Sequence, residues 1–146
     1  MAKQYRVNLM VKLINLITSS LARLGLGPRQ YHLLTVRGRA SGKPYSTTVS
    51  LVIDKDQSWL VAPYGEVGWV RNARAAGEVT LSRGRHSQQV RINQVDARAA
   101  APILKRYIAM EPITRPYFVA GPRASLAEFE AEADRHPVFL LKPAQR

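Results

Sequence analysis

The sequence predicts a mainly β fold with flanking helices, in which short antiparallel strands close into a small barrel. Two pairs of β-type runs are each separated by a short polar turn, "DKDQ" at 54–57 and "RGR" at 83–85, which is the pattern of hairpins. Residues 45–53 alternate in polarity and are rich in β-branched side chains, which favour strands. Hairpins imply antiparallel pairing, and the helical segments are too few for a doubly wound parallel sheet.

The individual elements follow from these turns and from residues that end or cap helices. Strands are expected at residues 31–36, 45–53, 58–63, 79–82, 87–95 and 137–141. A helix is expected at 69–76, because Gly77 can end it in a left-handed conformation. Asp96 can cap a second helix that runs to about residue 110, although Pro102 must kink that helix or move its start.

The N-terminal part is expected to stand apart, as a basic amphipathic helix at 1–28 before a barrel domain at 29–146. Lys12 interrupts its apolar run, so neither a membrane-spanning helix nor a signal peptide is expected. The apolar side chains recur at helical spacing, and they are Leu9, Leu13, Leu16, Ile17 and Leu21. The basic side chains around them are Lys3, Arg6, Lys12 and Arg23. Two roles stay open for the apolar face: packing on the barrel or on a partner subunit, and lying in a membrane surface with anionic lipids.

The amino-acid composition excludes several kinds of reaction and binding site. The chain of 146 residues has no cysteine, which excludes thiolate metal ligands, cysteine nucleophiles and disulfides, and suits a cytoplasmic setting. The histidines His32, His86 and His136 lack metal-binding spacing and are expected to be structural or exposed, so no metal is predicted. The acidic cluster at 128–134 is expected on a solvated helix face, which argues against hydrolysis by paired carboxylates.

The charge of the chain predicts an anionic ligand. The net charge is +12, and residues 1–53 contain no Asp or Glu. Within "TVRGRASGKPY", two glycines let backbone N–H groups approach an anion, Ser41 adds a hydroxyl group, and Arg39 and Lys43 add charge. A charged surface turn without a ligand is the alternative. Nucleic acid is not an expected partner, because the chain lacks a strand face of aromatic and basic residues and a helix-turn-helix pattern.

A second segment, "APYGEVGWVRNARA" at 62–75, combines a strand end, the glycines Gly65 and Gly68, and a helix N-terminus. Such an arrangement can receive a flat ring through backbone groups. Trp69 and Asn72 share one face of the expected helix. Core packing explains Trp69 equally well, whereas a buried Asn72 needs hydrogen-bond partners that a ligand could supply.

These segments, together with the closing "RHPVFLL", resemble the nitroreductase-type deazaflavin-dependent oxidoreductase family, which is related to the deazaflavin-dependent nitroreductase of actinobacteria. The resemblance runs from about Tyr31 to Pro143. It implies a split β-barrel that resembles FMN-binding flavin reductases. It also implies coenzyme F420 as the cofactor, with FMN as the alternative. F420 carries a phosphodiester and an oligoglutamate tail, which would be the anions that the basic loop faces.

The resemblance also implies which residues hold the coenzyme. Its anionic part would contact Arg39, Ser41 and Lys43, and its ring would border Ala62, Tyr64 and Gly65, with Trp69 and Asn72 behind it. The family pattern often has basic residues at two positions where this chain has Ala40 and Tyr45. Compensating charges would come from Lys43, Arg37 or Arg71.

The implied activity is hydride transfer from the reduced deazaflavin to a hydrophobic acceptor such as a quinone or a nitroaromatic. The candidate catalytic residues are Tyr64, Tyr107 and Tyr117. Tyr107, Tyr117 and Phe118 would cover the ring and shape the acceptor pocket, and Tyr64 would donate a proton or hydrogen bond to the acceptor oxygen. The alternative is a split-barrel protein that binds a flavin, heme or lipid with little turnover. A cytoplasmic location is expected, and contact with the inner face of the plasma membrane and a homodimer stay open.

Overall fold

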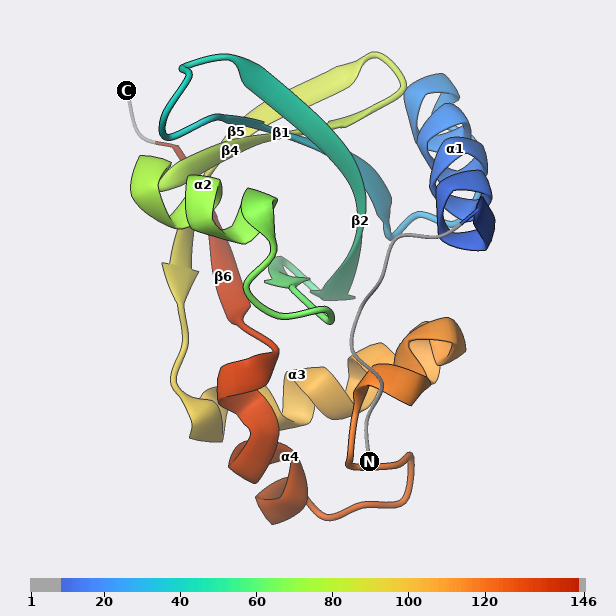
Figure 1. Ribbon diagram of the computed structural model, residues 1–146, viewed down its shortest axis with the longest axis vertical. Helices are drawn as coiled ribbons and strands as arrows, with labels where there is room; N and C mark the ends of the chain where they lie inside the picture. Colours follow the sequence, from blue (N-terminus) through green and yellow to red (C-terminus); the bar gives the residue numbers. More distant parts are fainter. Residues whose placement is uncertain (1–8, 145–146) are drawn as a thin grey trace.

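The computed structural model describes residues 9–144, in which six strands close into a barrel in the order β1-β2-β3-β6-β5-β4 (Figure 1). The strands are β1 (Tyr31–Arg37), β2 (Pro44–Asp54), β3 (Gln57–Val61), β4 (Glu78–Arg83), β5 (His86–Gln94) and β6 (Val138–Pro143). The predicted hairpins β2–β3 and β4–β5 are confirmed, and β1 pairs antiparallel with β2. The pairs β1–β4, β3–β6 and β5–β6 join strands that are far apart in the chain and so close the barrel.

Strand alternation fills the barrel with aliphatic side chains. Leu34 of β1 and Leu81 of β4 are buried in one core, together with Val49 and Leu51 of β2. Val52 of β2 belongs instead to a second core outside the barrel, so this strand is buried on both faces. Each fully buried Leu or Val side chain contributes roughly 1.5–3 kcal/mol, which makes these two cores the main source of stability.

Helix α2 (Gly68–Ala76) connects β3 to β4 and covers one end of the barrel. Its Val70 and Ala73 are fully buried in the barrel core. Gly77 follows with φ of 76°, and its N–H donates to the Ala73 carbonyl at 2.8 Å. The predicted left-handed end of this helix is therefore confirmed.

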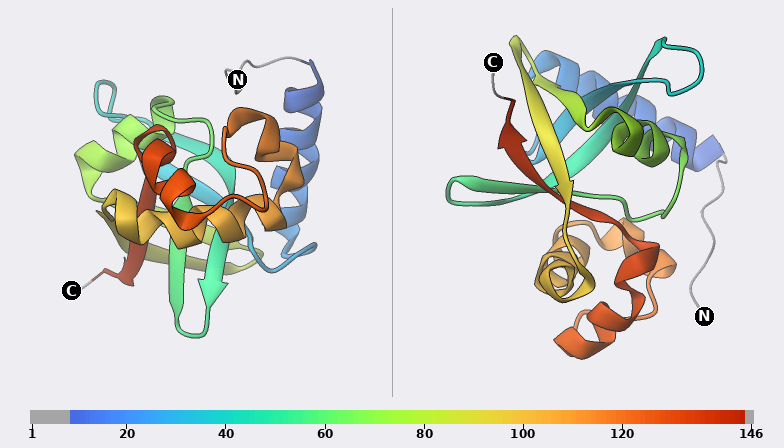
Figure 2. Two further views of the ribbon diagram at one scale, coloured as in Figure 1. Left: turned by 90° about the horizontal axis from the view of Figure 1, so that it is seen from below. Right: turned by 90° about the vertical axis from the view of Figure 1, so that its left-hand side faces the viewer.

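A layer of short helices covers the outer faces of β2, β3 and β6 (Figure 2). It consists of α3 (Ala97–Met110), the 3-10 helix η1 (Pro112–Tyr117), α4 (Leu126–Glu132) and the 3-10 helix η2 (Ala133–Arg135). Leu104 and Phe129 are fully buried between this layer and the sheet. The second core therefore fixes the helical segments against the barrel.

Helix α3 begins where its cap predicts, since the Asp96 side chain accepts the N–H of Ala99 at 2.8 Å. The helix runs through Pro102, so the alternative that this proline moves the helix start is wrong. Pro102 lies on the exposed side, whereas Ala101 and Ile103 beside it are buried. The cap and this buried face hold the helix together across the missing N–H of the proline.

Helix α1 (Leu9–Leu24) lies beside β1, β2 and β4 (Figure 1). Ala22 is fully buried there, and its carbonyl accepts the N–H of Gly84 at 2.9 Å. The predicted apolar face points elsewhere and is 52–83% exposed at Leu9, Leu13, Leu16 and Ile17. Packing of this face on the barrel is therefore wrong for these four residues, because the helix contacts the strands through a different side.

Two other expectations concern the N-terminal part of the chain and a possible membrane span. The basic residues Lys3 and Arg6 lie outside the described residues. Within residues 9–144, no helix combines the length and the apolar composition that crossing a membrane requires.

Candidate functional site

The loop between β1 and β2 is a compact turn at the end of the barrel that α2 covers. The N–H of Gly38 donates to the Lys43 carbonyl at 2.8 Å, and the N–H of Gly42 donates to the Gly38 carbonyl at 2.9 Å. The Ser41 Oγ accepts the N–H of Lys43 at 3.2 Å. Gly42 has φ of 74°, and a Cβ atom there would meet nothing within 4 Å. The loop is thus internally bonded and open on its outer side.

Arg39 is fixed to α2 by Asn72, which is 8% exposed. The Asn72 Oδ1 accepts the backbone N–H of Arg39 at 3.1 Å and its Nη1 at 2.7 Å. From the sequence, a ligand could supply hydrogen-bond partners to a buried Asn72. In the structure, Arg39 is the partner of its Oδ1. A neutral oxygen holds the guanidinium in place without cancelling its charge.

The basic side chains at this end differ in how far their charge is compensated. Arg37, Lys43 and Arg71 are exposed. Arg74 forms a bidentate pair with Glu66, with N–O distances of 2.6 and 3.0 Å. Of the two arginines on α2, Arg71 is therefore the one whose charge is available to an anion.

The end of β3 continues into the segment that borders α2. Ala62 is 1% exposed, and Tyr64 and Gly65 are half-buried. Gly65 has φ of 86°, and a Cβ atom there would lie 3.1 Å from the Arg135 carbonyl oxygen, so the close approach requires glycine. Trp69 packs partly against the barrel core, as the core-packing alternative predicts.

The three candidate catalytic tyrosines converge. The Tyr64 and Tyr117 rings meet edge to face, with centroids 4.9 Å apart and planes at 75°. Tyr107 is 5% exposed and belongs to the second core. Burial raises the pKa of Tyr107 well above 10.0, and the nearby Glu111, Tyr64 and Tyr31 raise it further. Tyr107 is therefore a neutral phenol, buried near Tyr64.

A polar cluster next to these tyrosines has no counterpart in the sequence-based predictions. The Tyr31 hydroxyl donates to both oxygens of Glu111, at 3.0 and 3.2 Å. Burial, followed by the charge of Glu111, raises the pKa of Tyr31 to about 12. Burial raises the pKa of Glu111, although the Tyr31 hydroxyl opposes the shift. Ser50 is buried beside them, and its hydroxyl also opposes the rise in the pKa of Glu111.

A second polar network corrects the prediction of a solvated acidic face at 128–134 for one residue: Glu128, Glu130 and Asp134 are exposed as predicted, whereas Glu132 is buried. Glu132 is 4% exposed. Its Oε1 accepts the N–H of Ala120 at 2.6 Å, and its Oε2 accepts the N–H of Val119 at 3.0 Å and contacts His136 Nε2 at 3.0 Å. Burial opposes the ionised form, but these donors outweigh it and lower the pKa of Glu132. The spacing of Glu132 and His136, four residues apart near the end of a helix, could have indicated the pair.

His136 connects this carboxylate to the segment that carries Tyr64. Its Nδ1 donates to the Pro63 carbonyl at 2.8 Å, and its ring stacks on Phe118 with centroids 3.8 Å apart. Both ring nitrogens lie next to oxygen atoms, Nδ1 next to the Pro63 carbonyl and Nε2 next to the Glu132 carboxylate. Phe118 thus packs on the histidine and does not join the Tyr64–Tyr117 pair. The network ties the residue before Tyr64 to the residues after Tyr117.

The described residues contain no group of three or more His, Asp or Glu side chains that could hold a metal ion. The structure brings the ten predicted site residues to the end of the barrel covered by α2 and to the adjoining tyrosine cluster. Arg39 and Asn72 connect the loop to α2, and Tyr64 and Tyr117 pack against each other.

Residues 19–118 match the family model described as F420H(2)-dependent quinone reductase. No curated protein matches the chain. Among solved structures, the chain is similar to an F420-H2 dependent reductase (FDR-A), with a TM-score of 0.54, 22% identity, and coverage of 78% of this chain and 95% of that one.

Two further solved structures show the same fold at low identity. The protein Atu2129 of unknown function from Agrobacterium tumefaciens str. C58 aligns with a TM-score of 0.58 at 16% identity, covering 99% of this chain. This chain spans 60% of the length of that protein. A putative pyridoxamine 5'-phosphate oxidase from Listeria innocua aligns with a TM-score of 0.52 at 14% identity, covering 94% of this chain and 95% of that one. These likenesses confirm the predicted split β-barrel.

Proposed function

This chain belongs to the F420H(2)-dependent quinone reductase family, and from that premise we propose where its coenzyme and acceptor bind. Family membership makes the protein an F420-dependent reductase with coenzyme F420 as its cofactor. In the proposed site, Arg39, Ser41 and Lys43 hold the anionic part of the coenzyme. The ring lies beside Ala62, Tyr64 and Gly65, with Trp69 and Asn72 behind it.

The observation that carries this proposal is the fixed Arg39 guanidinium next to an open, glycine-containing loop. Arg39 is held by Asn72 at 2.7 Å, and a Cβ atom at Gly42 would meet nothing within 4 Å. The N-terminus of α2 has no side-chain cap at Val67, and the space around the Gly68 Cα is open as well. Basic side chains and backbone N–H groups of this kind suit a phosphodiester and a chain of carboxylates.

The acceptor is proposed to be a hydrophobic quinone or nitroaromatic. The reduced deazaflavin supplies the hydride when it is bound. Tyr64 and Tyr117 offer aromatic surface to a flat acceptor, and the Tyr64 hydroxyl donates a hydrogen bond to the oxygen on which negative charge develops. Tyr107 stays neutral, and its burial keeps water out of the core near Tyr64.

The test is oxidation of F420H2 by the purified full-length protein with a quinone, with a nitroaromatic and with no acceptor. Tyr64→Phe is expected to lower kcat/KM for the acceptor on the order of a hundredfold and to leave coenzyme affinity unchanged. Tight F420 binding without oxidation by any acceptor would instead support the binding-protein alternative.

For the apolar face of α1 we propose peripheral attachment to anionic membranes. Leu9, Leu13 and Leu16 are 55–83% exposed, and Lys12 beside them is exposed as well. Such a face can lie among lipid headgroups, where each basic residue near the surface contributes about 1 kcal/mol. A hydrophobic quinone resides in the same layer, so attachment would raise its concentration near the pocket.

Substitution tests this proposal better than deletion of the helix, because a deletion would also remove the buried Ala22. A variant with Leu9, Leu13 and Leu16 changed to serine is expected to keep its melting temperature and to lose cosedimentation with anionic vesicles by at least about tenfold. Leu126→Ser is the control, since Leu126 is 50% exposed on α4. If the full-length protein does not cosediment with anionic vesicles, the proposal is wrong. A dimer that dissociates in the triple variant would assign this face to a subunit interface.

A further inference from the structure

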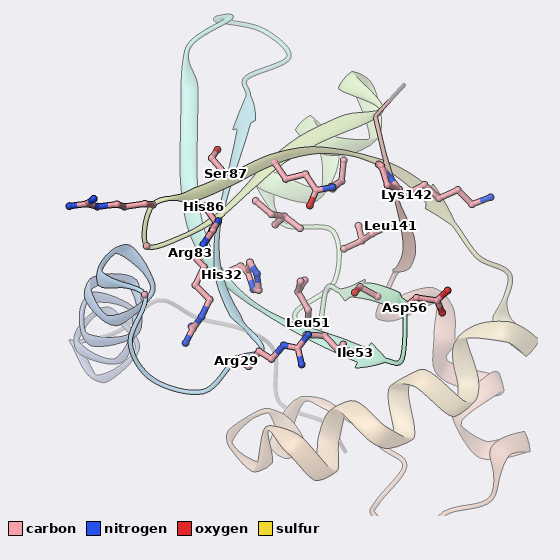
Figure 3. A pocket seen from close by; sticks show the side chains of 18 of the residues that line it. Arg29, His32, Leu51, Ile53, Asp56, Arg83, His86, Ser87, Leu141 and Lys142 are labelled. Atoms are coloured by element: carbon pink, nitrogen blue, oxygen red, sulfur yellow. The ribbon is translucent and has the colours of Figure 1, made fainter. Parts of the chain in front are cut away.

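A cavity of about 1090 Å³ opens at the end of the barrel opposite the site proposed above (Figure 3). It is lined by the β2–β3 turn with Lys55, the β4–β5 turn with Gly84, and Arg29 before β1. In an antiparallel barrel these segments lie at the end away from the β1–β2 loop and α2. None of the ten residues proposed to hold coenzyme or acceptor lines this cavity.

The floor of the cavity is the open end of the barrel core. Leu51, Leu81 and Val90 are buried core residues, and Ile53 and Leu141 pack against the same core from its edge. Helix α2 covers the other end of the barrel with two fully buried side chains, whereas at this end the core faces the cavity. None of the described lining residues is Phe, Tyr or Trp, so the floor offers aliphatic surface and no stacking platform.

The rim of the cavity is strongly basic. It carries Arg29, Lys55, Arg83, Arg85 and Lys142, and its single acidic residue is Asp56. Arg83 is held by backbone carbonyls, with its Nη2 2.7 Å from the Gly27 oxygen and its Nη1 3.0 Å from the Pro28 oxygen. Over the described part of the chain, Arg29, Lys55, Arg85 and Lys142 form no ion pair. The rim therefore presents uncompensated positive charge above an apolar floor.

His32 points into the cavity between floor and rim (Figure 3). Its Nδ1 lies 3.3 Å from the Gln30 carbonyl. Burial lowers the pKa of His32, and the charges of Arg83 and Arg29 lower it further. The positive charge of the rim therefore already acts on His32, and the resonances of its ring can report binding inside the cavity.

We propose that this cavity binds an anionic amphiphile, with an aliphatic chain on the barrel core and a carboxylate or phosphate head on the basic rim. The volume lies slightly above the range of small-molecule sites, which is roughly 300–1,000 Å³, so it can hold a long chain with its head group. Leu24 at the end of α1 also lines the cavity and is 69% exposed, so apolar surface continues from the helix to the opening. A nucleotide or flavin would find no Phe, Tyr or Trp ring here, only the smaller imidazole rings of His32 and His86, and a neutral lipid would leave the basic rim unused. The proposal does not depend on the coenzyme site at the other end.

The test uses the full-length protein and three probes below their micellar concentrations: oleate, lysophosphatidate and the neutral monoolein. Calorimetry is expected to give saturable binding of one oleate or lysophosphatidate per chain, with monoolein at least about tenfold weaker. The double variant Arg85→Glu, Lys142→Glu is expected to weaken both anions by at least about tenfold. Arg98→Glu is the matched control, because Arg98 is an exposed arginine on α3 that does not line the cavity. Thermal unfolding of each variant shows whether it is folded.

Histidine side-chain resonances locate the bound probe. His32 and His86 line the cavity, whereas His136 is buried next to Phe118, near the other end. Oleate is expected to shift the signals of His32 and His86 and to leave that of His136 unchanged. Tighter binding of oleate would indicate a fatty acid as the ligand, and tighter binding of lysophosphatidate would indicate a phospholipid. The proposal is overturned if neither anion saturates, if Arg98→Glu weakens binding as much as the double variant, or if only His136 shifts. It is also overturned if the basic rim proves to be a dimer seam that excludes both anions.

Discussion

Replacing Glu132 with glutamine removes one charge from the network that ties the segment before Tyr64 to the residues after Tyr117. In the native protein three donors point at the carboxylate: the N–H groups of Val119 and Ala120 and the Nε2 of His136. A glutamine offers one oxygen, and its NH2 group turns toward a donor. At least one buried donor therefore loses its acceptor, which costs about 1–3 kcal/mol. His136 also loses the charged acceptor next to its Nε2, and a hydrogen bond to a charged group contributes about 1.5–3 kcal/mol.

We therefore expect Glu132→Gln to lower stability by about 3 kcal/mol at pH 7. For a domain of this length the melting temperature falls roughly 3 °C for each kcal/mol, so the expected decrease is about 10 °C. Circular dichroism of the full-length protein measures it. Glu130→Gln is the control, because Glu130 is exposed on the same helix and its change is expected within about 0.5 kcal/mol.

The pH dependence of this difference has a defined sign. The pKa of Glu132 is lower in the folded protein than the ordinary value of 4.5. The stability that its ionised form contributes is present above pH 4.5 and is lost as the pH falls through the folded value. The gap between wild type and Glu132→Gln should therefore be constant near neutrality and shrink below pH 4.5. A gap of less than 2 °C at pH 7, or one that is the same at pH 7 and pH 3, would refute this reasoning.

Three further outcomes are expected. Arg39→Ala should raise the Kd for F420 on the order of ten- to a hundredfold, because a charge-assisted contact contributes roughly 1.5–3 kcal/mol. Fluorescence titration measures the Kd. Unchanged affinity in a folded variant would show that the anion binds elsewhere, with Arg71 as the next candidate. F420 should bind more tightly than FMN. Its affinity should fall as salt is added, because contacts to an oligoanion are screened over roughly 8–10 Å. Calorimetry that finds equal affinities for F420 and FMN, both independent of salt, would contradict this expectation. Glu111→Gln should raise the melting temperature at pH 7, because burial raises the pKa of Glu111 and its ionisation opposes folding as the pH rises past 4.5. That gain should vanish at pH 4 and below, and a gain that persists there would show that charge is not its cause.

The strands and helix ends could be predicted because their causes are local. Alternation in β2 and β5, the Asp96 cap and the left-handed Gly77 each depend on a few neighbouring residues. Pro102 gave an ambiguous expectation, since its missing N–H is local but the packing that keeps α3 intact is not. The closure of the barrel by β1–β4 and β3–β6 followed only from the number of strands and from the family resemblance.

The buried acids could not be predicted, because their partners are distant in the chain. Glu132 lies in "FEAEADRHP", where charged residues surround it and a solvated helix is the natural interpretation. Its burial depends on the backbone at 119–120, which donates two N–H groups that would otherwise lack acceptors. Glu111 meets Tyr31 across 80 residues of sequence. The contact between Arg39 and Asn72 was not foreseen either, although each residue lies in a segment that resembles the family.

Net positive charge attracts every anion, so it does not distinguish one binding surface from another. Each end of this barrel carries a guanidinium that neutral oxygen atoms hold at short distance. Arg39 is held by the Asn72 oxygen at 2.7 Å, and Arg83 is held by the Gly27 carbonyl at 2.7 Å. Neutral partners leave both charges uncompensated, and a side chain that is already fixed loses little freedom when an anion arrives. Arg74, by contrast, is neutralised by Glu66. Salt should therefore weaken anion binding at both ends of the barrel, whereas Arg39→Ala should weaken it at one end alone.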